Sequence, residues 1–152
     1  MILLGVLMDK SDWTLLVIAA AGGDTLTPIQ LQKALFLIGN TMPTVDEGDF
    51  YVFRPYNYGP FCQNIYSDAE HLYADGLINI VSIPNQSWSN YSVTETGLAR
   101  AKMLSSQLDD PQFNYLSSLV KWVKGLSFEQ LLSFVYEKYP KFAENSVFGV
   151  KK

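Results

Sequence analysis

The sequence predicts a mainly α-helical domain with a small β component, a winged helix with a β-hairpin wing and a helical C-terminal extension. Helical periodicity and capping residues mark three helices before residue 76. Two strand-like segments, 77–83 and 88–93, follow the third helix and flank a turn. Three more helices are expected after them. Helices that precede a hairpin in this order are typical of a winged helix.

Length and composition favour one domain over residues 1–152, with its core at about 11–104 and the extension at about 105–152. Apolar residues make up 48% of the chain and aromatics 14%, which excludes a disordered protein. The single cysteine cannot close an internal disulfide and favours a reducing compartment, so we expect a cytoplasmic protein. The apolar start, Met1–Met8, lacks a basic region and a cleavage pattern, and no stretch is long enough to span a bilayer. We therefore expect no membrane partner.

The first helix is expected to begin at Ser11 as its N-cap and to end at Gly22-Gly23. Its buried face is Trp13, Leu16, Val17 and Ala20. Thr27-Pro28 predicts the next start, a capping hydroxyl followed by proline at the first helical position.

The second helix is expected to bury Leu31, Leu35 and Ile38, whereas Gln32 and Lys33 point elsewhere. Gly39-Asn40 and Pro43 end it.

The middle of the chain predicts a strand, a turn and a helix. Asp49–Phe53 is rich in aromatic and β-branched residues, and Arg54–Pro60 contains two prolines and a glycine. The third helix, roughly 61–75, ends before Gly76. Its inward residues are expected to be Ile65, Ala69, Leu72 and Tyr73.

Three helices are expected after the wing. Thr94 opens the fourth, and Pro111 separates it from a fifth. The fifth is expected to bury Phe113, Leu116, Val120 and Val123. Ser127 and Gln130 form a capping box for the sixth, with Leu126 stapled onto Leu131, and Pro140 ends it.

The sequence offers little for catalysis. The lone histidine, His71, lies nine residues after Cys62, which is about 13 Å along one helix and too far for a nucleophile and its base. Asp68 and His71 are half a metal site at most, and the spacing of Asp46, Glu47 and Asp49 does not match a calcium loop. We found no phosphate-binding loop or nucleophile elbow. The sequence therefore predicts no enzyme, no cofactor and no metal site.

DNA binding is the alternative function for a winged helix, and charge argues against it. The third helix contains Asp68, Glu70 and Asp75 but no Lys or Arg, and the wing from Asn79 to Asn90 has no basic residue. Lys and Arg contacts to phosphates dominate affinity for DNA. Residues 1–99 carry three basic and ten acidic residues, a balance of −7; residues 100–152 carry eight and five, a balance of +3. The basic residues of the C-terminal helices alternate with glutamates, which indicates a solvated face and at most a weak nucleic-acid patch.

The aromatic content favours a protein partner. Nine Tyr, nine Phe and three Trp exceed the needs of a small core, and Tyr and Trp are enriched at interface centres. Arg54, Tyr56 and Tyr58 crowd the rigid turn before the third helix. Alternatively, Tyr58-Gly59-Pro60 sets only the start of that helix, and for Tyr58 we favour this structural role.

Three segments resemble one family in the order expected. Leu26–Phe36, LTPIQLQKALF, resembles the "pLqKllyf" segment of the SocA-like, or Panacea, antitoxin domains and their uncharacterised winged-helix relatives. Tyr56–Phe61 is similar to their "ykyGPv" turn and Val93–Gly97 to their "LTekG" after the wing. The three segments span about two-thirds of the chain, and Leu131–Pro140 is similar to the tails of the uncharacterised relatives. Phe61-Cys62-Gln63 departs from the family's usual continuation.

The resemblance implies an antitoxin-type module that binds a toxin or, as in one member, acts as an adaptor for a protease. It transfers no catalytic residues and points to Gln32, Lys33, Tyr58, Gly59 and Pro60. We therefore expect a non-catalytic protein-binding module, with a DNA-binding regulator as the alternative. Its partner-binding residues are expected to be Gln32, Lys33, Arg54, Tyr56, Tyr58, Gly59 and Pro60.

Overall fold

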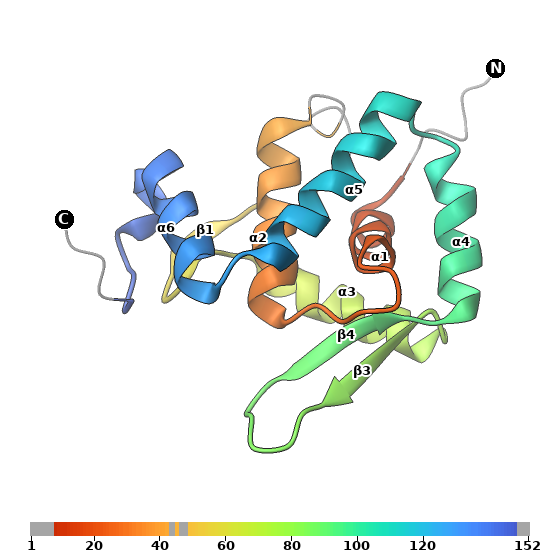
Figure 1. Ribbon diagram of the computed structural model, residues 1–152, viewed down its shortest axis with the longest axis horizontal. Helices are drawn as coiled ribbons and strands as arrows, with labels where there is room; N and C mark the ends of the chain where they lie inside the picture. Colours follow the sequence, from red (N-terminus) through yellow and green to blue (C-terminus); the bar gives the residue numbers. More distant parts are fainter. Residues whose placement is uncertain (1–7, 43–44, 46–48, 149–152) are drawn as a thin grey trace.

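A computed structural model describes residues 8–42, 45 and 49–148, and within them the chain is mainly α-helical with two small antiparallel hairpins (Figure 1). This is the fold class that the sequence predicts. Helix α1, Lys10–Ala20, lies at the centre, and α2, α3, α4 and α5 all pack against it. Figure 1 shows α1 nearly end-on, framed by α3, α4 and α5.

Helix α1 begins two residues earlier than expected. Its N-cap is Asp9, whose carboxylate accepts the Asp12 N–H at 3.0 Å, and the Asp12 carboxylate accepts the Asp9 N–H at 3.1 Å. The prediction of Ser11 as the N-cap is wrong, because its hydroxyl instead donates to the Asp9 carboxylate at 2.7 Å. Since helices surround α1, residues 13–18 are all buried rather than those of one face.

Helix α2, Pro28–Thr41, begins where the sequence predicts. The Thr27 side chain and Gln30 form a capping box, and Pro28 occupies the first turn. The expectation that Gln32 and Lys33 point away from the core is wrong, since the two side chains are only 1% and 2% exposed. Both lie under the segment that follows residue 53, as described below.

The strand predicted at Asp49–Phe53 is absent, because residues 49–53 have no strand partner and their aromatic rings pack into the core instead. Phe50 meets Trp13 edge-on, and Phe53 meets Phe36 edge-on. The strands form instead in the residues that follow, 54–61, most of which were predicted to be a turn. Strand β1, Arg54–Tyr56, pairs antiparallel with β2, Gly59–Phe61.

Helix α3, Gln63–Ala74, leads directly into the wing. Ile65, Ala69 and Leu72 are buried as predicted, but Tyr73 is 51% exposed and its predicted inward position is wrong. Strands β3, Ile78–Ser82, and β4, Ser89–Val93, form the predicted hairpin. Leu26 forms an isolated antiparallel bridge with Tyr91 of β4, on the side of β4 away from β3.

Three helices follow, as expected: α4 (Glu95–Ser105), α5 (Asp110–Gly125) and α6 (Phe128–Lys138). Thr94 and Ser127 cap α4 and α6 as predicted. Pro111 does not separate helices but lies in the first turn of α5, which Asp109 caps. Phe113, predicted to be buried, is 40% exposed. A 3₁₀ helix, η3 (Pro140–Ala143), completes the extension.

The extension is joined to the winged-helix core by aromatic contacts. The Phe36 ring of α2 meets the Tyr139 and Phe142 rings edge-on, at centroid distances of 4.9 and 4.8 Å. None of the helices in the described ranges is long and apolar enough to cross a membrane.

Candidate functional site

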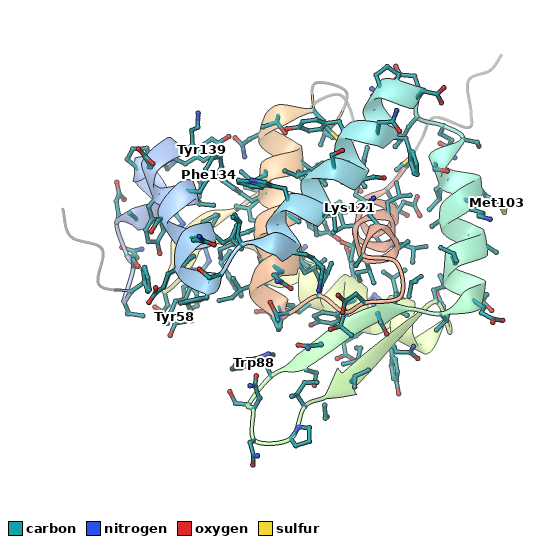
Figure 2. The ribbon with its side chains drawn as sticks, in the orientation of Figure 1. Tyr58, Trp88, Met103, Lys121, Phe134 and Tyr139 are labelled. Carbon is teal, nitrogen blue, oxygen red and sulfur yellow. The ribbon has the colours of Figure 1, made fainter. Side chains whose placement is uncertain are left out.

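The residues singled out by the sequence lie on or beneath the β1–β2 hairpin, residues 54–61, here called the 54–61 hairpin. Its strands face α2, α6 and η3. Figure 2 shows Tyr58 beside α6, at the end of the molecule opposite Met103 of α4. The supporting residues and the exposed residues of this hairpin form two distinct sets.

Gln32 fixes the end of the hairpin by bonding to the backbone of Cys62. Its amide nitrogen donates to the Cys62 carbonyl at 3.0 Å, and its amide oxygen accepts the Cys62 N–H at 2.9 Å. Both bonds are buried. A primary amide can make this reciprocal pair because it carries a donor and an acceptor side by side. The Gln32 side chain therefore pairs with the backbone of Cys62 as a neighbouring β-strand would.

Lys33 supports the middle of the hairpin. Its ammonium nitrogen donates to the Pro60 carbonyl at 3.1 Å. Burial lowers the Lys33 pKa from 10.5 to about 7, because the charged form loses its hydration. The Lys33 stem also lies against Gly59, where an added Cβ would be 3.5 Å from the Lys33 Cε and 3.1 Å from a Tyr136 ring carbon. Gly59 has φ +93°, a conformation that favours glycine.

These contacts show where four residues of the predicted partner-binding set lie. Gln32, Lys33, Gly59 and Pro60 are buried and hold the hairpin from below. They are not positioned to touch a partner directly. Such residues form a buried contact between two segments that are distant in the sequence.

Arg54 and Tyr56 are exposed and ordered by stacking. The Arg54 guanidinium lies 4.7 Å from the Tyr56 ring centroid and 5.6 Å from that of Phe61. The Tyr56 and Phe61 rings are 4.8 Å apart and tilted by 31°. Phe61 in turn meets Tyr66 of α3 edge-on. The cation is therefore held in place over two aromatic rings.

Tyr58 belongs to a second aromatic group that the sequence did not reveal. Its ring, 42% exposed, packs edge-on against Phe128 of α6, which is 43% exposed. Phe128 also meets Phe148 edge-on, at 5.4 Å. Val147 bonds to the hairpin through its N–H and the Asn57 carbonyl at 2.9 Å, with its side chain 63% exposed. Phe128 follows the Ser127 cap, and no local signal distinguishes it from a core residue.

Cys62 and His71, considered above as a nucleophile and its base, lie at opposite ends of α3. Cys62 is buried at the start of α3, whereas His71 is exposed in its last turn. Asp68 accepts a 2.6 Å hydrogen bond from the Tyr51 hydroxyl, which also bonds to the buried Thr14 hydroxyl at 2.7 Å. Asp46 and Glu47 lie outside the described residues. Within the described ranges, no three His, Cys, Asp or Glu side chains are grouped to hold a metal ion.

The surface on which a winged helix reads DNA has little positive charge. The solvent-facing residues of α3 include Glu70 and His71 but no Lys or Arg. The nearby Lys10 ammonium lies over the Tyr51 ring, 5.8 Å from its centroid. Lys124 pairs with Asp24 at 3.3 Å and donates to the Thr25 carbonyl. Neither α3 nor residues 77–94 contribute a Lys or Arg side chain to this surface.

Comparison with protein-family models finds none that matches this chain, and comparison with curated proteins likewise finds no match.

Proposed function

We propose that this chain is a non-catalytic protein-binding module, antitoxin-like or adaptor-like, which engages its partner through the exposed side of the 54–61 hairpin. The observation that carries the proposal is the division of roles within that hairpin. Four buried residues, Gln32, Lys33, Gly59 and Pro60, fix its base, and three exposed ones, Arg54, Tyr56 and Tyr58, face solvent. A cytoplasmic location, inferred from the single cysteine, is part of the proposal.

The exposed residues are of the types that dominate protein interfaces. Tyr, Trp and Arg are enriched among the residues whose truncation costs more than about 2 kcal/mol of binding energy. Arg54 and Tyr56 share one ring platform, and Tyr58 adjoins the exposed Phe128. Because both groups are already ordered in the free chain, a partner would pay less conformational entropy to bind them.

The test is affinity capture with the tagged full-length chain, followed by mass spectrometry. We expect one protein to be recovered reproducibly, and Arg54→Ala or Tyr58→Ala to weaken its binding by about 30-fold, the equivalent of roughly 2 kcal/mol. Met103→Ala is the control, since Met103 is exposed on α4 at the other end of the molecule (Figure 2). Equal capture by all four proteins would contradict the proposed surface.

The DNA-binding alternative is tested by titrating a labelled duplex at low and moderate salt. We expect no binding above that of an acidic control protein, because α3 and the wing supply no phosphate contacts. Affinity that falls steeply with salt would instead identify a DNA-binding regulator.

A catalytic role is tested by the double variant Cys62→Ser and His71→Ala, which we expect to retain partner binding and biological effect.

A further inference from the structure

We propose that the outer edge of β3 pairs antiparallel with β3 of a second copy of this chain, so that the two wings form one continuous sheet. This edge belongs to a different sheet from the 54–61 hairpin. The inference therefore does not rest on the proposed function.

Hydrogen bonds at Leu26 reveal which backbone groups of β3 face outward. The Tyr91 N–H donates to the Leu26 carbonyl at 2.9 Å, and the Tyr91 carbonyl accepts the Leu26 N–H at 2.8 Å. Both polar groups of Tyr91 thus point away from β3. Ile80 is opposite Tyr91 in the β3–β4 register. Since directly opposed residues of an antiparallel pair are either both bonded to each other or both turned away, the N–H and C=O of Ile80 point outward.

The alternation extends this result along the strand. Asn79 and Val81 face β4, and Ser82, like Ile80, directs its N–H and C=O outward. No described segment of the chain pairs with this side of β3, because the sheet contains only β4 and the Leu26 bridge on its other side. The edge therefore presents unpaired backbone donors and acceptors at Ile80 and Ser82.

This edge lacks the features that normally prevent strand pairing. Proteins protect free edges with lysines, prolines or bulges. Residues 77–94 contain no charged side chain at all, and their only proline, Pro84, lies in the turn. The β3–β4 register runs from Ile78 to Ser82 without a bulge. Val81 is 39% exposed beside the outward groups. The edge is therefore open and neutral.

Charge favours a second copy as the occupant. The chain carries a net charge of −4, so two copies repel least where they meet through an uncharged segment. The wing is such a segment, and it offers nothing to a charged peptide. It is also self-complementary: when the pairing is centred on Val81, Ile80 of each copy lies opposite Ser82 of the other, so outward groups meet outward groups. Val81 then packs against its equivalent. The contact is small, so we expect a weak dimer that forms at high micromolar concentration.

The test is sedimentation equilibrium of the full-length chain over a range of concentrations. We expect a reversible monomer–dimer equilibrium. Val81→Lys places two like charges side by side at the centre of the pairing and should abolish the dimer. Met103→Lys, on an exposed position of α4, changes the net charge equally and should leave the dimer unchanged. Ser82→Pro should also abolish the dimer, because it removes an N–H that points outward and is not used by β4.

Amide hydrogen exchange on the unsubstituted chain identifies the edge without any variant. We expect the Ile80 and Ser82 amides to gain protection as concentration rises, whereas those of residues 54–61 do not. A chain that is monomeric throughout, a dimer that survives both wing substitutions in proteins with an unchanged circular dichroism spectrum, or loss of the dimer in Met103→Lys would each overturn the proposal. Tyr58→Ala should leave dimerisation intact, which separates this result from that of the capture experiment.

Discussion

Lys33 shows how a single buried residue can make the stability of this domain depend on pH. Its pKa is lowered by burial to about 7, against 10.5 in the unfolded chain. Below pH 7 the amine is charged in both states, and the cost of burying that charge is fully present. Between pH 7 and 10.5 the folded state releases the proton while the unfolded state keeps it, so folding becomes more favourable as the pH rises.

We therefore expect Lys33→Met to alter the pH dependence of stability. Relative to the variant, the unsubstituted chain should gain about 2 kcal/mol of unfolding free energy between pH 7 and pH 9, at up to about 1.4 kcal/mol per pH unit. Urea unfolding of both proteins at these pH values measures the difference in unfolding free energy. The contributions of titratable groups present in both proteins cancel in this difference. A constant difference across this range would show that Lys33 is not deprotonated in the folded state.

Gln32 should contribute to stability through two bonds rather than one. In Gln32→Leu the buried N–H and C=O of Cys62 both lose their partner, and each unsatisfied group costs about 1–3 kcal/mol. We expect a loss of about 2 kcal/mol or more in urea unfolding. Gln63→Leu is the control, because Gln63 is exposed at the start of α3 and should change stability by less than about 0.5 kcal/mol. Equal losses of unfolding free energy in Gln32→Leu and Gln63→Leu would show that the buried hydrogen bonds of Gln32 add nothing to stability.

At the scale of the elements, the sequence predicted best what depends on neighbouring residues alone. The caps Thr27, Thr94 and Ser127 were found because each bonds within its own first turn. The missing strand at Asp49–Phe53 was not foreseeable in this way, since a strand requires a partner from elsewhere in the chain.

The candidate site was also predicted only where the signal is local in the sequence. The sequence places Arg54, Tyr56 and Tyr58 in a rigid turn and favours a structural role for Tyr58, whereas the structure finds all three exposed on a hairpin. It did not place Gln32 beneath the hairpin or Phe128 beside Tyr58, because the partners in these contacts are 30 and 70 positions apart in the chain. Helical periodicity assigns residues to a face, but it does not indicate that neighbouring helices bury almost every face, as around α1.

Gly97 illustrates a constraint between two elements. A Cβ added there would lie 1.9 Å from the carbonyl oxygen of Leu77, so α4 could not pack against the start of the wing. Although alanine favours helices by about 1 kcal/mol over glycine, we expect Gly97→Ala to destabilise the fold by about 2 kcal/mol. Gly125→Ala is the matched control: nothing lies within 4 Å of an added Cβ there, and stability should not fall. Thermal unfolding of both variants provides the comparison.

At the scale of the whole molecule, Phe36 joins the winged-helix core to the C-terminal extension. Its ring meets Phe53 of the core and the Tyr139 and Phe142 rings of the extension edge-on. These contacts predict that the core and the extension unfold together.

We expect a single urea transition whether it is followed by tryptophan fluorescence or by far-ultraviolet circular dichroism. Phe36→Ala should lower the free energy of unfolding by about 4 kcal/mol. Phe113→Ala, at an exposed position of α5, should cost about 1 kcal/mol or less. Two separate transitions in the unsubstituted chain would instead assign the extension to an independent folding unit.

The separation of buried and exposed residues in the 54–61 hairpin allows its surface to vary independently of its fold. Substitutions at residues 54, 56 and 58 alter what the hairpin offers to its surroundings without touching the amide and amine that anchor it. The exposed surface can thus change while the framework beneath it stays the same. The same property makes this loop a natural position for randomised libraries, in which new binders would be selected while the folding of the remainder is preserved.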